Sequence, residues 1–293
     1  MSRTARPAAR VPQGVPVILE TLDAFGNALR SEADLFSSAG EDCVNPATGP
    51  IFIEGAEAGD MLRVDILRID LAAQGVVATM PGLGVMGGSV AEQTRLVSIK
   101  DGQAHFAWKT APGALHRALP LKPMVGVIGV APAGSDELTD WPGSHGGNLD
   151  CKHMIEGASL YLPVAVPGAL FAAGDLHALM GDGEVGITGV EMAGELTVRF
   201  TVSKGKQWPL PMLVAEGRLM TLASAETLDA AANLATRHMQ EFLVQELGFD
   251  PTEAAMLLSV EGNLRICQVV NLRKTARLEL PLEILDQCGY VLP

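Results

Sequence analysis

The residues best suited to chemistry gather between positions 144 and 191 of the sequence. Within this stretch, the HGGNLD segment at residues 145–150 offers an imidazole, an amide and a carboxylate, from His145, Asn148 and Asp150. The two glycines between them let the backbone bend, so that the three side chains can face one point. Imidazole suits zinc and related cations, whereas carboxylate and amide oxygens also suit harder ions such as calcium. An ordinary polar loop, with the histidine exposed and the other two side chains in Asx-turns, fits the same residues.

A second segment, GDLHALMGDGE at residues 174–184, places Asp175 two positions before His177. In an extended chain, residues two apart project from the same face, so this carboxylate and this imidazole can converge. The MGDGE sequence that follows holds two glycines, which permit a tight turn beside a bound ion. The alternative is that Asp175 only orients a structural histidine and that the turn closes an ordinary hairpin.

Three charged side chains nearby are candidates for proton transfer or for stabilising an oxyanion. Lys152 can polarise a carbonyl oxygen, although pairing with Asp150 is the simpler role. Glu156 follows four positions later. Glu191 comes after a Gly-Val dipeptide and is a candidate metal ligand or base, or a strand carboxylate paired with Arg199. These residues therefore indicate acid–base chemistry without assigning it.

The cysteines favour free thiols in a reducing compartment. Cys43, Cys151, Cys267 and Cys288 include no CxxC pair and no disulfide-dense pattern, which predicts a cytoplasmic protein. Cys151 has His153 two positions on, and this neighbour supports a thiol nucleophile as an alternative. A cysteine beside a histidine is also common by chance.

The elements that must position these residues follow a strand–turn–strand pattern from residue 15 to about 203. Residues 61–71 alternate apolar and polar with a period of two, and residues 121–130 indicate a buried strand. Residues 74–94, rich in glycine and poor in charge, predict a long loop beside a pocket. Further strands are predicted at residues 14–19, 160–166, 183–188 and 195–203. Because no strand–helix–strand alternation is present, a β-sandwich or barrel is favoured over a Rossmann-like sheet.

The pattern changes after Trp208. Residues 224–247 have helical spacing, with Ser224 as the predicted N-cap and Gly248 as the C-cap. A second helix is predicted to begin at the Asp-Pro pair of residues 250–251 and to end near residue 262. Two strands, at residues 265–270 and 275–280, are predicted near the end of the chain.

The predicted fold class is therefore mainly β, with a sandwich-like or barrel-like body and a smaller α+β portion. A flexible tail is expected at residues 1–14. The β-rich body, with the site and with room for two β subdomains, is expected at residues 15–205. The α+β portion is expected at residues 206–293.

Composition narrows the classes of partner. The 293 residues include 34 Asp and Glu against 21 Lys and Arg, which gives a formal net charge of −13. Such an acidic surface repels polyanions, so nucleic acid is excluded as an expected partner, whereas small neutral substrates and cations are compatible. No apolar run reaches the length that a membrane-spanning helix needs, so no membrane partner is expected.

The sequence resembles the acetamidase/formamidase family over most of its length. Its most specific segments are HGGNLDCK (145–152), EGASLYLPV (156–164), GALFAAGDLHALMGDGEV (168–185) and GVEMAGE (189–195). The resemblance extends from ETLDAF (20–25) to ICQVVNLRKTAR (266–277), and it includes GPIFIEGAEAGD (49–60) and AAMLLSVEGNLRICQVVN (254–271). It implies hydrolysis of a short aliphatic amide, formamide or acetamide, to the acid and ammonia. It also implies a mainly β fold with a smaller α+β portion, in a homo-oligomer such as a dimer or trimer.

With this reaction in view, we expect metal-assisted hydrolysis with a divalent cation, zinc in the first place and calcium as the alternative. The expected metal ligands are Asp150, His177, His145 and Asp175. Glu191 or Glu156 is expected as the base or a further ligand, and Lys152 or Asn148 as the partner of the oxyanion. Two alternatives stay open: an amidase that depends on Cys151, and a metal-stabilised binding or structural protein without amidase activity.

Overall fold

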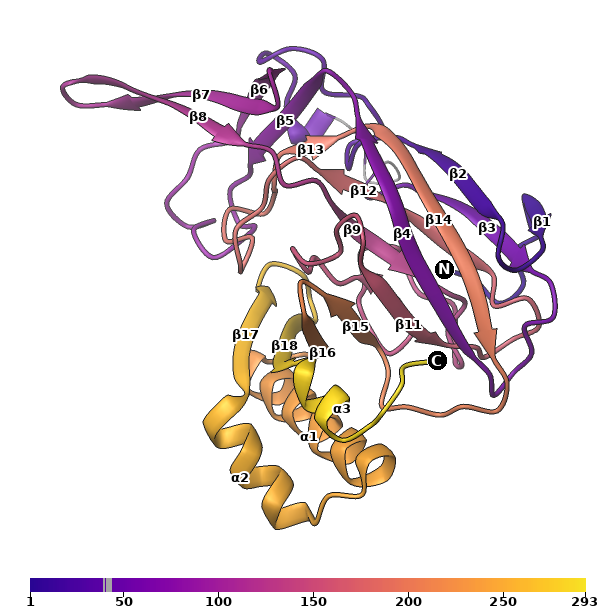
Figure 1. Ribbon diagram of the computed structural model, residues 1–293. Helices are drawn as coiled ribbons and strands as arrows, with labels where there is room; N and C mark the ends of the chain where they lie inside the picture. The colour runs from indigo at the N-terminus through magenta and orange to yellow at the C-terminus, as the bar shows by residue number, and fades with distance from the viewer. Residues whose placement is uncertain (39, 41–43) are drawn as a thin grey trace.

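The computed structural model describes residues 1–38, 40 and 44–293, and within them two β-sheets pack face to face with helices at one end (Figure 1). The packing between the sheets is direct, because the ring of Phe171 in one sheet lies 4.9 Å, centroid to centroid, from the ring of Phe200 in the other. Val64, Ile66 and Val198, all fully or almost fully buried, belong to the same core. The alternating pattern of the strands thus buries one shared apolar layer.

The first sheet carries the site. Its ten described strands are β1 (Ala9–Val11), β3 (Ala47–Ile53), β5 (Gln74–Thr79), β6 (Gln93–Lys100), β7 (Gln103–Thr110), β8 (Gly113–Pro120), β9 (Met124–Gly129), β10 (Gly146–Asn148), β12 (Phe171–His177) and β13 (Glu191–Met192). Strand β12 is its centre, because it pairs with β3, β9 and β13, and β9 in turn pairs with β10. This arrangement places the ends of β10, β12 and β13 close together.

The second sheet has eight described strands in the order β17-β18-β16-β15-β11-β4-β14-β2, all antiparallel to their neighbours. Their bounds are β2 (Pro16–Thr21), β4 (Met61–Leu71), β11 (Ser159–Pro163), β14 (Gly194–Ser203), β15 (Met212–Ala215), β16 (Arg218–Ala225), β17 (Asn263–Gln268) and β18 (Lys274–Pro281). The long pair β4 and β14 covers the first sheet (Figure 1).

The helices are α1 (Leu228–Leu247), α2 (Pro251–Glu261) and α3 (Glu283–Gln287), and a short 3-10 helix, η1, spans Phe36–Ser38. Helix α1 packs on β16 and β18 through a second core, in which the rings of Trp208 and Phe242 meet edge to face at 5.2 Å. Caps set the helix ends: Asp250 accepts from two backbone N–H groups at the start of α2, and Gly248 ends α1 with a φ of 74°. Within the described chain, no helix combines the length and the apolar character needed to cross a bilayer.

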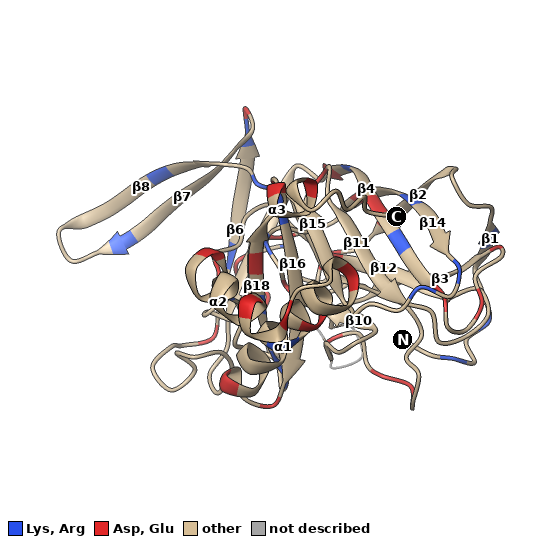
Figure 2. Ribbon diagram, turned by 60° about the horizontal axis from the view of Figure 1, so that its bottom comes forward, with Lys and Arg blue, Asp and Glu red and all other residues tan. Residues whose placement is uncertain are grey.

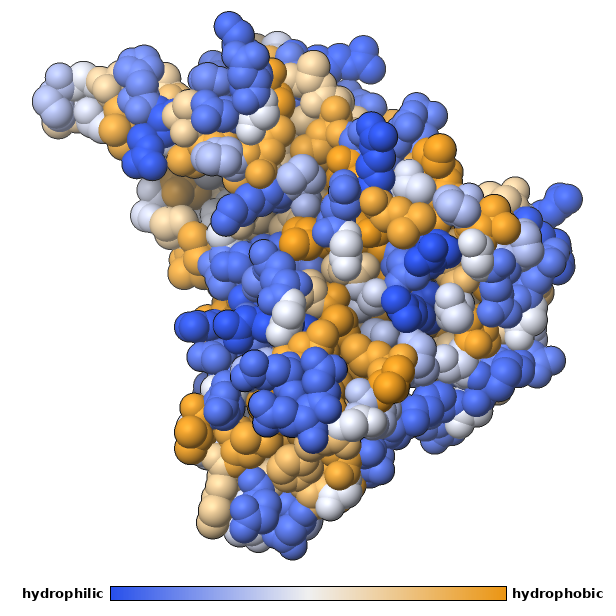
Figure 3. Space-filling view, in the orientation of Figure 1, coloured by the Kyte–Doolittle hydropathy of each residue, from blue (hydrophilic) through white to orange (hydrophobic). Residues whose placement is uncertain are grey.

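Strands β7 and β8 form a hairpin that projects from the body (Figure 1). Basic side chains lie on this hairpin, whereas acidic ones are frequent on α1 and α2 (Figure 2). The surface of the hairpin mixes hydrophilic and hydrophobic residues, as does the face of the body beside it (Figure 3).

The fold class expected from the sequence is confirmed: the body is mainly β and the C-terminal portion adds helices to the second sheet. Strand β4 has the predicted bounds. Three local predictions differ from the structure. The predicted loop begins with strand β5, the first helix starts at Leu228 with Thr227 as its N-cap, and residues 183–188 form a turn that touches Gln268 through one isolated bridge.

The predicted tail, residues 1–14, is also structured in part. Strand β1 pairs in parallel with β3, and the backbone N–H of Glu137 donates to the carbonyl of Met1 at 2.9 Å. A basic, proline-containing composition predicts an unpaired tail, but the exposed edge of β3 offers it hydrogen-bond partners.

Candidate functional site

Five ionisable side chains meet in the interior at the end of the first sheet. Asp175 and His177 project from β12, and Glu191 projects from β13. Asp150 comes from the segment after β10, and Glu184 comes from the turn between β12 and β13. All five are buried, with exposed fractions between 0% and 7%. Charged groups rarely lie buried without a partner or a metal, and this makes the cluster a candidate functional site.

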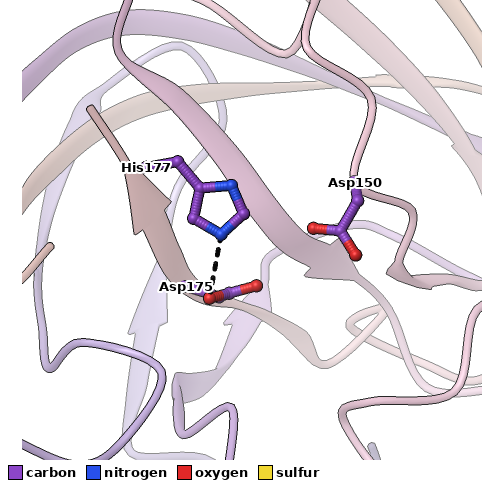
Figure 4. A group of neighbouring side chains, drawn as sticks. All are labelled: Asp150, Asp175 and His177. Atoms are coloured by element: carbon purple, nitrogen blue, oxygen red, sulfur yellow. Dashed lines mark hydrogen bonds and ion pairs between the residues drawn. The ribbon is translucent and has the colours of Figure 1, made fainter. Parts of the chain in front are cut away.

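The donor atoms form two overlapping triads around one imidazole. The first joins Asp150, Asp175 and His177 (Figure 4), and the second joins His177, Glu184 and Glu191. Within each triad, one donor atom per residue lies within 4.8 Å of the others. His177 Nε2 is 3.3 Å from Asp175 Oδ1 and 2.9 Å from Glu191 Oε2. The imidazole is therefore the point at which the carboxylates converge.

The backbone is shaped to bring the carboxylates together. Asp150, Asp175 and Glu184 have positive φ values of 43°, 57° and 47°. Aspartate adopts this left-handed region more readily than most residues, but each instance carries strain, and such strain clusters at functional sites. Opposite Asp175 on β9 stands Gly126, where a Cβ would lie 2.6 Å from Asp150 Oδ1 and 3.0 Å from Asp175 Cγ. The glycine leaves the space that the two carboxylates occupy.

Burial and mutual repulsion govern the charges of the cluster. Burial, helped by the neighbouring Asp175, raises the pKa of Asp150 to about 7. Burial raises the pKa of Glu191 to about 8 against the opposing effect of His177, and it raises the pKa of Glu184 well above its usual range. Burial would lower the pKa of His177, but Glu191 and Asp175 hold it well above its usual value. Without a further cation, the cluster therefore retains protons to balance its excess of carboxylates.

Several polar atoms of the site have no hydrogen-bond partner among the described residues. They include Asp150 Oδ1, Asn148 Oδ1 and the Nδ1 atom of His177, which is the ring nitrogen opposite to the one that contacts Asp175 and Glu191; all are buried. An unpaired buried polar atom costs free energy, so we expect a bound group that interacts with the lone pairs of these oxygen and nitrogen atoms. Carboxylate oxygens and an imidazole nitrogen are ligands of divalent cations. The residues present thus fit a metal ion.

The cluster forms one side of a cavity of about 230 Å³, which connects it with the surface. Asn148, Asp175, Glu184 and Glu191 line this side. Asn271, from the loop between β17 and β18, closes the site from the C-terminal portion. Its Nδ2 donates to Asp150 Oδ2 at 3.3 Å and to the carbonyl of Asn148 at 3.4 Å. Both structural portions of the chain contribute to the site.

Of the residues singled out in the sequence, the structure brings together Asp150, Asp175, His177, Glu191 and Asn148. The other three lie apart from this group. His145 is buried beside β10, where burial lowers its pKa to about 4 and keeps it neutral. Lys152 donates to Asp182 at 2.8 Å and, with Glu156, lines a separate cavity of about 310 Å³.

Cys151 is fully buried in the main core, and Cys267 is also buried, whereas Cys288 is exposed. The described residues that line the 230 Å³ cavity do not include Cys151. The geometry gives no support to the thiol alternative, because the sulfur faces the core. Cys43, the fourth cysteine, lies outside the described residues.

No role is predicted from the sequence for two further acidic residues that the structure buries near the site. Glu184 belongs to one of the two triads that could hold a metal ion. The sequence feature that indicates this is the glycine before it in the MGDGE turn, which lets the carboxylate turn toward the cluster. Asp23 is buried near Asp175, but it accepts hydrogen bonds from the backbone N–H groups of Phe25 and Asn27, so it shapes a turn.

The fold and the donor set define a mainly β protein with a buried carboxylate–histidine centre suited to a divalent cation. The model of the Acetamidase/Formamidase family matches residues 4–141 and 135–287, and the chain belongs to this family, as the sequence predicted.

Among solved structures, the chain is similar to an acetamidase from Bacillus halodurans, with 45% identity and a TM-score of 0.93 over 99% of this chain and 96% of that one. It is similarly close to a predicted acetamidase/formamidase from Thermoanaerobacter tengcongensis, with 44% identity and a TM-score of 0.93 over 99% and 95%. A curated relative, the acetamidase of Mycolicibacterium smegmatis, is 28% identical over 54% of this chain and 53% of its own length. The chain spans between 52% and 62% of the length of the curated relatives that it matches.

Proposed function

We propose that this protein is an amidohydrolase that cleaves a short amide to the carboxylate and ammonia, with a divalent cation held by the buried cluster. The observation that carries the proposal is the convergence of four carboxylates on His177, three of which also line a cavity, in a chain of the Acetamidase/Formamidase family. Asp150, Asp175 and Glu184 would hold the cation together with the imidazole. When bound, the cation would supply Lewis-acid polarisation of the amide carbonyl and a lower pKa for water.

The side chains of the site supply the remaining steps. Hydrolysis moves one proton from water to the leaving nitrogen, and Glu191 can carry it. The backbone N–H of Gly189 donates to Glu191 Oε1 at 2.8 Å, and this hydrogen bond fixes the carboxyl group at the cavity wall. Asn148, which lines the same wall, is the candidate donor to the developing oxyanion through its amide NH₂ group. Substrate and proton carrier would then lie on one side of the cavity.

The donors of the cluster are compatible with two cations. One imidazole is compatible with zinc, which the sequence favours, and the excess of carboxylates suits calcium, the alternative. Because His145 lies outside both triads, the ligand set contains one histidine where the sequence predicted two. A metal analysis of the purified protein separates the two ions.

The proposal is tested by ammonia release from formamide and acetamide, with the Glu191→Gln variant beside the wild type. Glutamine keeps the shape of glutamate and can still accept from Gly189, but it cannot carry the proton. We expect kcat/KM to fall by about 10²–10⁴-fold. His116→Gln, on the exposed hairpin, is the matched control and should leave kcat/KM unchanged.

Two results would contradict the proposal. The first is a metal-supplemented wild type that releases no ammonia from any short amide, which favours the binding or structural alternative. The second is a folded Glu191→Gln variant with wild-type kcat/KM, which removes the proposed proton carrier.

A further inference from the structure

The cavity above the cluster is larger than formamide or acetamide requires. Its volume is about 230 Å³, and a water molecule takes up about 30 Å³ in the liquid, so it holds roughly seven or eight water-sized groups. Acetamide has only four non-hydrogen atoms. An amide of that size, placed with its carbonyl at the cluster, would leave about half of the cavity to water.

Part of the cavity lining is apolar, and we call this part the apolar wall. It is formed by Phe25, Phe36, Leu83, Ile187, Val270 and Leu272. The two phenylalanine rings meet edge to face at 5.2 Å. Leu272 is 69% exposed and Leu83 is 39% exposed, although both line a cavity. A ligand with an apolar group would remove these side chains from water, which is favourable in proportion to the area covered.

The charges around the cavity disfavour an anion. Its lining includes the carboxylates of Asp140, Asp175, Glu184 and Glu191, and no lysine or arginine is present among the described lining residues. A carboxylate on the substituent of the substrate, away from the cation at the cluster, would therefore have no lysine or arginine in that described lining to pair with.

From the size, the apolar wall and the charges, we infer that this site takes a neutral amide with an apolar substituent larger than the methyl group of acetamide. The inference rests on the proposed amidase function and names the substrate class within it. Leu83 and Leu272 are the residues that would determine this specificity, because they lie at the exposed end of the apolar wall.

Two series of amides test the inference on the metal-supplemented protein. The acyl series runs from formamide through acetamide and propionamide to butyramide and releases ammonia. The N-alkyl series runs from acetamide to N-propylacetamide; its substituted members release acetate and a primary amine, so acetate is measured in this series. Burial of each CH₂ group corresponds to about a fourfold change in binding. We expect kcat/KM to rise by up to about fourfold per CH₂ in at least one series, and the responding series identifies the side of the amide that faces the wall.

Variants of the wall provide the second readout. In Leu83→Ser and Leu272→Ser, the ratio of kcat/KM for the longest amide to that for the shortest should fall several-fold, because the apolar contact is lost. Both side chains are exposed enough for the fold to tolerate the change. Leu115→Ser is the matched control, since Leu115 is 49% exposed on the hairpin and does not line the cavity; its ratio should equal that of the wild type.

The outcomes separate this inference from the proposed function. If kcat/KM falls along both series while formamide is still hydrolysed, the amidase function stands and the inferred substrate class is wrong. Wall variants with an unchanged ratio would also overturn the inference. If no amide of any length is hydrolysed, the proposed function itself fails, and the inference fails with it.

Discussion

Gly126 gives the sharpest test of the geometry of the site. It lies on β9 between Val125 and Val127, which pair with the residues on either side of Asp175 in β12. A Cβ there would lie 2.6 Å from Asp150 Oδ1, whereas ordinary contacts begin at 3.4 Å. The Asp150 carboxylate would therefore have to move by about 0.8 Å, and the Asp175 carboxylate must also shift. Because misplacement by about 1 Å can cost 10²-fold in rate, Gly126→Ala should lower kcat/KM about 100-fold.

In free energy, this loss corresponds to about 2.7 kcal/mol of transition-state stabilisation. Ammonia release gives kcat/KM, and metal content per chain and urea unfolding are measured on the same sample. The overpacked core should destabilise the fold by only about 1–3 kcal/mol, so the protein remains folded. Gly134→Ala is the control, because a Cβ there has no neighbour within 4 Å. A folded Gly126→Ala protein with wild-type kcat/KM and metal content would refute the geometric reasoning.

Three further predictions concern protons, stability and the thiol. Burial raises the pKa of Asp150 to about 7 and that of Glu191 to about 8, so a cation must displace protons at pH 7. Zinc affinity should fall from pH 8 to pH 6, and calorimetry in two buffers should detect proton release; a pH-independent affinity contradicts this. Burial would raise the pKa of Asp65, but hydrogen bonds from a serine and two arginines hold it below its usual value. The Asp65 carboxylate therefore stabilises the fold at pH values above its usual pKa, and this contribution is lost as the pH falls through its pKa in the folded state. Asp65→Asn should cost about 1–2 kcal/mol at pH 7 and less at pH 3 by urea unfolding; an equal cost at both pH values would disprove it. Cys151→Ala should retain amide turnover of the wild-type order, whereas a folded but inactive variant would restore the thiol mechanism.

Local geometry explains which parts of the site could be predicted from the sequence. Asp175 and His177 are two residues apart in a strand, so their convergence follows from the period of the strand. The roles suggested for Lys152 and Glu156 rested only on proximity in sequence to Asp150. In the structure, Lys152 pairs with Asp182 instead.

The remaining parts of the site depend on long-range packing. Asn271 reaches Asp150 from 121 residues away, and no local pattern signals that contact. The need for glycine at position 126 is visible only when β9 and β12 are paired. The glycine at position 75 is one reason why the sequence predicts a loop at residues 74–94. It lies in strand β5, where a Cβ would meet Met192 Sδ at 2.5 Å, so a glycine that suggested a loop instead permits close packing of the strand.

The central claim is that the buried carboxylates around His177 hold a divalent cation that the amidase reaction requires. The most direct test is amide turnover by protein stripped with a chelator, verified as metal-free by elemental analysis, and then supplied with zinc or calcium. We predict that turnover disappears on stripping and returns with about one equivalent of the fitting cation per site. Full turnover by verified metal-free protein would contradict the claim.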